Sequence, residues 1–139
     1  MIIEYAGIRF NQLTPDSEGC YWYVIEFEGW GGASVRQSTV EPTSVDGLII
    51  ANALAGSRAI GMKILCKAPN EEKFWAAYNY ILDNTDNLYD PVDFIVTEGS
   101  TQRKVGVVRA AETRIRIAGV GAFEADLSLM APDPKKTVV

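Results

Sequence analysis

The sequence predicts a mainly β domain in which two packed sheets, or a partly open barrel, carry one flanking α-helix. Apolar and polar residues alternate over several short runs that are separated by glycine, proline and asparagine. A convincing helical spacing of apolar residues occurs only over residues 71–84. The 139 residues, 47% of them apolar and 22% charged, suit one soluble domain with a single core.

Two short strands and one long strand are predicted in the N-terminal part. IIEYAGIRF reads as a strand pair around Ala6-Gly7, and a polar turn region containing Pro15 and Gly19 follows. The run CYWYVIEFEGW, residues 20–30, predicts a long strand. With strict alternation, one face would hold Tyr21, Tyr23, Ile25 and Phe27, and the other Trp22, Val24, Glu26 and Glu28.

An extended loop is predicted from Gly29 to Gly47. Glycine, serine, threonine and proline dominate this segment, and neither a strand period nor a helix period is present. Structureless loops of this length are uncommon in compact domains and are usually functional or disordered. Trp30, Val35 and Arg36 argue against a purely flexible linker.

The second half of the chain predicts a strand, the helix and four more strands. Ile60, Met62, Ile64 and Cys66 alternate with other residues up to Pro69. Asn70 then caps a helix over Glu71–Asn84, whose apolar stripe of Phe74, Trp75, Tyr78, Ile81 and Leu82 is expected in the core. Further strands are expected at Val92–Glu98, Arg103–Ala110, Thr113–Ala118 and Ala122–Met130, before a short C-terminal tail, residues 131–139.

The composition excludes several kinds of chemistry. Histidine is absent, which rules out imidazole-based triads and histidine zinc sites. Cys20 and Cys66 have neither metal-ligand nor redox spacing and are expected to be buried reduced thiols. A net charge of −5 disfavours general nucleic-acid binding. We therefore predict no catalytic, cofactor-binding or metal-binding residue and no cofactor. Neither a spanning helix nor an export signal is predicted.

Two charged pairs stand out. Glu26 and Glu28 lie two apart on one predicted strand, so their side chains point the same way, roughly 7 Å apart. Inverting glycosidases use a similar spacing but place the two carboxylates on opposite sides of a sugar, so a solvated face is the expected reading. Arg114 and Arg116 form the matching basic pair, either facing solvent or opposing the acidic pair of a neighbouring copy.

Several short motifs occur together along the chain. They are Gly29-Trp30-Gly31-Gly32, Arg36, Asp46-Gly47, Arg58 followed by Ile60, Ala68-Pro69 before the helix, and Ala131-Pro132-Asp133-Pro134 after the last strand. In this order and spacing the chain resembles the N-terminal, ring-forming domain of phage distal tail proteins. These are the minor tail proteins of phages with long non-contractile tails.

The resemblance implies a tail-tube-like fold and a structural role in the virion, not an enzyme. Six copies would form a ring at the tail tip that joins the tail tube to the tip or baseplate and leaves a channel for DNA. A belt-like loop would reach the neighbouring copy, with interface residues Trp30, Val35, Arg36, Val40 and Pro42. Glu26, Glu28, Arg114 and Arg116 become lumen or inter-subunit charges. The implied partners are the chain itself, tube and tip proteins and, in passing only, DNA; no membrane is involved.

Three alternatives stay open from the residues. Trp30 either folds onto its own domain or anchors in a neighbouring subunit. The chain could be a tail-tube or tail-completion protein, which shares the fold and also forms rings. It could also be a free carbohydrate-binding β-sandwich that uses Trp22, Trp30 or Trp75 as a stacking platform. Longer relatives continue past the Pro-Asp-Pro segment into a second, often sugar-binding, domain, whereas only KKTVV follows here, so receptor binding is not carried over.

Overall fold

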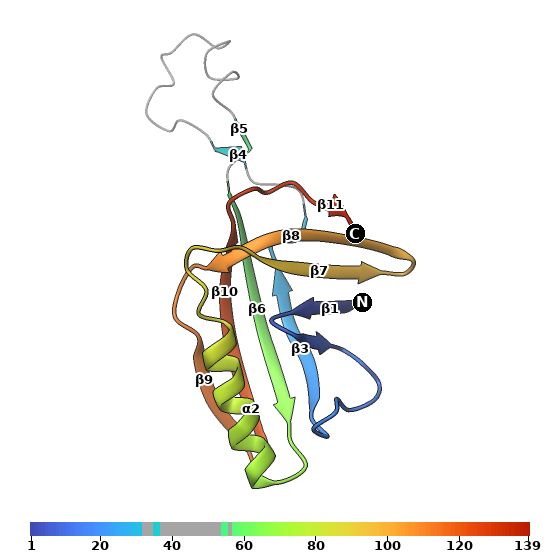
Figure 1. Cartoon of the computed structure of the whole chain (residues 1–139), viewed down its shortest axis with the longest axis vertical. Helices are drawn as coiled ribbons and strands as arrows, with labels where there is room; N and C mark the ends of the chain where they lie inside the picture. The colour runs from blue at the N-terminus through green and yellow to red at the C-terminus, as the bar shows by residue number, and fades with distance from the viewer. Residues whose placement is uncertain (32–34, 37–53, 56) are drawn as a thin grey trace.

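The computed structural model describes residues 1–31, 35–36, 54–55 and 57–139. This part of the chain is mainly β, with one helix (Figure 1). The elements are β1 Ile2–Tyr5, β2 Ile8–Phe10, β3 Tyr21–Glu28, β4 Val35–Arg36, β5 Leu54–Ala55, β6 Arg58–Lys67, α2 Glu71–Asn84, β7 Val92–Glu98, β8 Thr101–Arg109, β9 Arg114–Gly119, β10 Ala122–Ala131 and β11 Thr137–Val138. No described helix is both long and apolar enough to cross a membrane.

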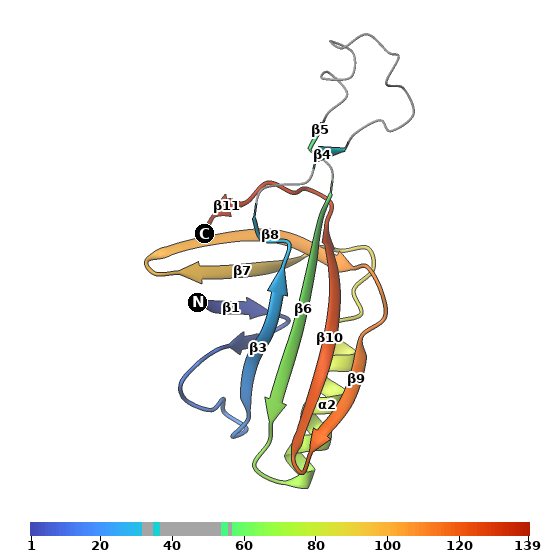
Figure 2. The same ribbon diagram turned by 180° about the vertical axis from the view of Figure 1, so that it is seen from behind.

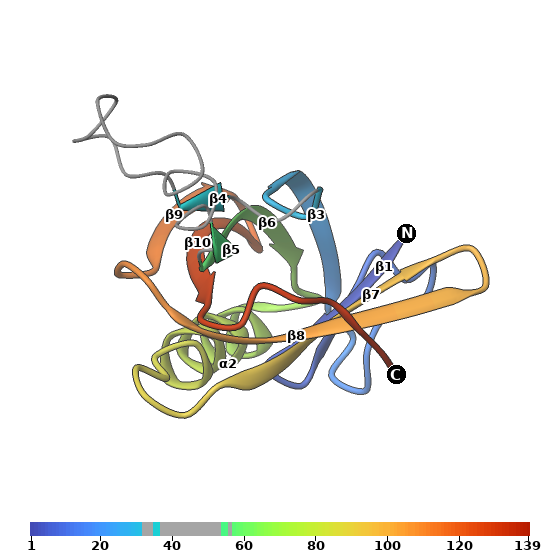
Figure 3. The same ribbon diagram turned by 90° about the horizontal axis from the view of Figure 1, so that it is seen from above.

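Nine strands form one curled, open sheet. Its order is β2-β1-β7-β8-β10-β6-β3, with β11 added to β8 and β9 added to β10, and the described pairings are antiparallel. Only Leu129↔Arg109 and Met130↔Val108 join β10 to β8, so the sheet turns there (Figure 3). The outermost strands, β2 and β3, come together where the Asn11 amide donates to the Trp22 carbonyl at 2.8 Å. Of the two predicted arrangements, the structure has the partly open barrel.

Helix α2 lies against the core side of this sheet and has the predicted bounds. The Asn70 side chain accepts a hydrogen bond from the Lys73 amide at 2.9 Å, and Glu71 and Glu72 occupy the first turn, where the helix dipole favours negative charge. Phe74 then packs edge-on against Phe123 of β10, with ring centroids 5.6 Å apart. The helix therefore begins with a good cap and is fixed in place by aromatic packing.

The predicted apolar stripe of α2 is wrong along one flank. Phe74 and Ile81 are buried as expected, together with Ala77, but Trp75 is 43% exposed and Leu82 is 38% exposed. Each residue turns a helix by about 100°, so the residues next to Phe74 and Ile81 lie well away from the centre of the buried face. Tyr78, the remaining member of the predicted stripe, is partly buried, and its ring packs edge-on against Phe123 with centroids 5.9 Å apart.

The predicted faces of β3 are wrong beyond its middle, because the strand contains a β-bulge. Val24 pairs with Ile64 and Glu26 with Lys63, which leaves Ile25 as the extra residue. The bulge resets the alternation, so Phe27 joins Trp22 on the core side while both glutamates face outward with the tyrosines. Strict alternation placed Trp22 on the same face as the glutamates. The bulge instead puts the rings of Trp22 and Phe27 on the core side and the glutamates on the opposite side.

The C-terminal half follows the prediction closely and adds one strand. The four strands predicted after the helix are present with ends shifted by a few residues at most. Beyond Ala131, Pro134 is buried, and Thr137 and Val138 pair with Lys104 and Arg103 as β11 on the edge of β8. Cys20 and Cys66 are free and buried, as predicted.

Candidate functional site

The wall formed by β3, β6, β10 and β9 has an outer face turned away from α2, which we call the outer wall (Figure 2). Strand register places charged residues of this wall in lateral rows. One row runs Glu26, Lys63, Asp126 and Arg114, so negative and positive side chains alternate from β3 to β9. The next row runs Tyr23, Leu65, Glu124 and Arg116. Residues that are far apart in sequence thus make one patterned surface.

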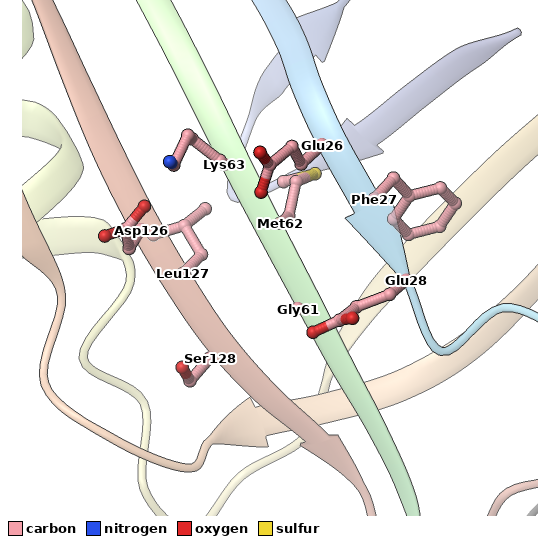
Figure 4. A pocket seen from close by; sticks show the side chains of 9 residues that line it. All are labelled: Glu26, Phe27, Glu28, Gly61, Met62, Lys63, Asp126, Leu127 and Ser128. Atoms are coloured by element: carbon pink, nitrogen blue, oxygen red, sulfur yellow. The ribbon is translucent and has the colours of Figure 1, made fainter.

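A shallow hollow of about 430 Å³ lies in the outer wall around Gly61 (Figure 4). Gly61 has no side chain, and the Glu28 carboxylate lies over it: a Cβ at this position would be 2.7 Å from Glu28 Oε1. Glu26 and Asp126 flank Lys63 in the same view. Sequence alternation correctly placed the two glutamates on one face, and the structure adds Lys63 and Asp126 to them.

Arg114 and Arg116 lie at the opposite edge of the same face. Arg116 Nη2 is 2.8 Å from Glu124 Oε2, and Arg114 Nε is 3.9 Å from Glu112 Oε1. Both arginine side chains remain largely exposed, at 59% and 77% respectively. The predicted acidic pair and basic pair therefore occupy the two lateral edges of one wall and do not contact each other within the chain.

Trp30, at the start of the long loop, is packed inside its own domain. It is 9% exposed, and its ring lies 6.2 Å from that of Phe27 and 5.9 Å from that of Phe94, centroid to centroid. Its Nε1 donates to Glu98 Oε1 at 3.0 Å, and the Lys136 ammonium lies 4.5 Å from the ring centroid. The sequence left open whether Trp30 packs onto its own domain or anchors in a neighbouring subunit. In the structure Trp30 packs onto its own domain.

Arg58 joins the loop base to the C-terminal tail. It is 4% exposed, and its Nη1 donates to the carbonyls of Gly29 at 2.9 Å and Gly31 at 2.7 Å. Its Nε donates to the Pro134 carbonyl at 3.1 Å. Burial lowers the pKa of Arg58, and desolvation, reinforced by the charge of Arg58, lowers the pKa of Lys136. One guanidinium on β6 thus holds two segments that are distant from each other in sequence.

Sequence reasoning missed this role of Arg58, although a signal exists. Arg58 is in phase with Ile60 and Met62, so it belongs to the buried face of β6. A charged residue on such a face requires partners, because an unpaired buried charge is costly. The position alone could have indicated a buried, hydrogen-bonded arginine.

The other predicted belt residues are only partly described. Val35 and Arg36 form β4, which pairs with β5 through Val35↔Ala55 and Arg36↔Leu54, but their side chains lie outside the described part. Val40 and Pro42 lie outside the described residues altogether. The pairing of β4 with β5 therefore brings the two segments that flank residues 37–53 side by side.

Two of the three tryptophans that the carbohydrate-binding alternative uses as a stacking platform are buried. Trp22 is 6% exposed and packs edge-on against Phe10 and Phe123, and Trp30 is buried as described above. Only Trp75 presents a substantial surface, beside a hollow of about 420 Å³ that Ile117 and Val120 also line. One exposed ring on a helix is a weaker basis for sugar stacking than the three that the sequence offered.

Comparisons with known proteins add no functional assignment, and the described residues form no metal site. Among the described residues, no group of three or more His, Cys, Asp and Glu side chains could hold a metal ion. No protein-family model matches the chain, and no curated protein matches it. The arrangement that remains is a wall of fixed charges with opposite signs at its two edges, beside a loop whose base is held by buried groups.

Proposed function

We propose that the chain is a structural ring protein of a phage tail, located at the distal end between the tail tube and the tip or baseplate. The observation that carries this proposal is the outer wall, a sheet face without a covering layer in the described part, acidic at the β3 edge and basic at the β9 edge. A surface with complementary ends favours head-to-tail association of identical copies, which closes into a ring when the rotation allows it. Six copies are taken from the resemblance.

The fold is compatible with the tail-tube-like architecture that the resemblance implies. A curled sheet with one flanking helix leaves the outer wall free, and the long loop starts from a base held by Arg58 and Trp30. A firmly held base suits a belt that reaches the next copy. Val35, Arg36, Val40 and Pro42 are the belt residues that we expect at that interface.

The outer wall is proposed to face the channel through which DNA passes. It carries four acidic and four basic side chains: Glu26, Glu28, Glu124 and Asp126, and Lys63, Lys67, Arg114 and Arg116. A lining of balanced charges, in a chain whose net charge is −5, offers DNA phosphates no basic surface to adhere to during passage. The partners of the ring are then the tube above it and the tip below it, with DNA as a transient passenger.

Negative-stain electron microscopy of the purified chain tests this function. We expect annular particles of one diameter with an open centre. Filaments of stacked rings would favour the tail-tube alternative, and the absence of annular particles at every concentration would contradict the ring.

The channel assignment has its own test, with variants in the middle of the wall and away from both edges. Asp126→Lys/Ser128→Lys raises the wall charge by three units per copy, and the resulting rings should retain short duplex DNA on a sizing column at low salt. Asp83→Lys/Asp90→Lys, at exposed positions outside the wall, serves as the control. Equal DNA retention by both variants would remove the outer wall from the channel.

A further inference from the structure

We propose that β9 of one copy pairs in antiparallel fashion with β3 of the next copy, so that the outer wall continues from chain to chain. This inference rests on the proposed ring, since it names the edges through which the copies join. It differs from the belt contact, because it uses only described residues of the folded domain.

Both edges have unpaired backbone in the described part of the chain. β9 pairs with β10 and with no other described strand. The far edge of β3 is occupied by Asn11, which bonds the Trp22 carbonyl at 2.8 Å and the Val24 amide at 2.9 Å. From Ile25 to Glu28 that edge has no described strand beside it. Unpaired strand edges readily accept another strand.

The strand directions permit this junction. Each neighbouring pair along β3, β6, β10 and β9 is antiparallel, so β9 runs opposite to β3. A second copy placed beside the first in the same orientation therefore offers its β3 antiparallel to β9. The contact is head-to-tail and leaves both outer edges of the pair free for further copies.

One register satisfies the charges. It places Arg114 opposite Glu28 of the next copy and Arg116 opposite Glu26, with these four side chains on the outer wall. Arg116 would then lie between Glu26 of the next copy and its own Glu124, which is 2.8 Å away. The alternating charges within one chain would thus continue across the junction.

The same register also brings exposed apolar side chains together. Ile117 is 63% exposed and Ile25, the bulge residue, is 46% exposed, and they fall opposite one another. Ile115, partly buried against the core, falls opposite Phe27, which is also packed against the core. Cross-strand pairs of this kind stabilise adjacent strands. Only this alignment pairs both arginines with glutamates, and apolar pairs accompany the charge pairs.

Registers shifted by two residues lose one of the two charge pairs and bring an unfavourable or unmatched neighbour instead. Sliding two residues one way keeps Arg114 opposite Glu26 but places Arg116 opposite Val24 and Glu112 opposite Glu28. Sliding the other way keeps Arg116 opposite Glu28 but places Arg114 opposite Trp30. In the selected register Arg114 shares a row with Glu26 inside the chain but meets Glu28 across the junction. This stagger of two residues per copy agrees with the offset that closing a sheet into a barrel requires.

Charge reversal at each edge, followed by mixing, tests the junction. The double variant Glu26→Lys/Glu28→Lys has two basic edges. The double variant Arg114→Glu/Arg116→Glu has two acidic edges. Each variant alone should therefore stay monomeric at concentrations where the wild-type chain assembles. We expect the concentration for half-assembly to rise at least about 100-fold in native mass spectrometry, because like charges then face each other at the junction. An equimolar mixture restores opposite charges at every junction, and it should assemble into species containing equal numbers of the two variants.

Controls separate the outcomes. Asp83→Lys/Asp90→Lys, with the same charge change as the β3 variant, should assemble like the wild-type chain, and circular dichroism should show that every variant is folded. Rings of both single-edge variants would overturn the junction while leaving the ring function standing, as would a mixture that fails to assemble. A wild-type chain that stays monomeric would overturn both.

A cross-linking variant provides a second readout. Ile25→Cys/Ile117→Cys places one thiol on each edge at the predicted contact, while Cys20 and Cys66 remain buried. Mild oxidation should give a ladder of covalent multimers, and each single variant should stop at the dimer or remain a monomer. A double variant that assembles but gives no ladder would exclude this register.

Discussion

Removing the guanidinium of Arg58 should destabilise the domain by about 3 kcal/mol. Arg58→Met keeps most of the side-chain length but leaves the carbonyls of Gly29, Gly31 and Pro134 without their donor. Hydrogen bonds to charged groups contribute about 1.5–3 kcal/mol each. The loss of three such bonds is partly offset, because the variant no longer has to bury a cation. For a domain of this size the loss corresponds to a fall in Tm of roughly 10 °C.

Calorimetry or thermal circular dichroism measures this effect directly. Arg58→Lys should lie between wild type and Arg58→Met, because one ammonium cannot reproduce the planar fork that reaches two segments. Arg9→Met is the matched control: Arg9 is half exposed and pairs with Glu4 at 3.2 Å, so its removal should cost less than about 1 kcal/mol. A Tm for Arg58→Met within 2 °C of wild type would refute the clamp at the loop base.

Three further predictions concern the core and the loop base. Burial raises the pKa of Tyr5 to about 12 from 10.0, so between pH 10 and 12 only the unfolded chain ionises this phenol. The free energy of unfolding should therefore fall by up to about 3 kcal/mol across that window, as urea titrations would show, whereas Tyr5→Phe should lack this component. Burial raises the pKa of both Cys20 and Cys66, so the native chain should resist a thiol-reactive dye at pH 8 and react at two sites in denaturant; rapid native labelling would contradict their packing. Gly29→Ala should cost at least about 2 kcal/mol, because Gly29 has φ +90° and its Cβ would lie 1.9 Å from the Ala59 carbonyl oxygen, whereas Gly31→Ala, with open space around it, should be nearly neutral.

Local signals in the sequence were sufficient for the helix and for most strands. Asn70 and the two glutamates after it mark the helix start, and the turn at Gly99-Ser100 separates β7 from β8. Alternation also placed Glu26 and Glu28 on one face, because the bulge precedes both. These features depend on residues a few positions apart, which is the range over which capping and periodicity act.

Features that depend on distant partners were missed. The bulge at Ile25 exists because β3 pairs with β6 in a particular register. Strand β11 is two residues long and forms because the tail returns to the edge of β8. Arg58 bonds Pro134, 76 positions away, so its role required the fold to be known. The charge rows of the outer wall likewise arise from strand register and not from any local motif.

Native mass spectrometry of the purified chain, over a concentration series, tests the ring most directly. The comparison is a variant in which residues 37–53 are replaced by a short Gly-Ser linker, which the antiparallel pairing of β4 with β5 allows without disturbing Trp30 or Arg58. We predict one closed species with a fixed number of copies, six by the resemblance, for the wild-type chain, and weaker assembly for the linker variant. A wild-type chain that stays monomeric at every concentration, or forms open-ended series of multimers, would contradict the closed ring.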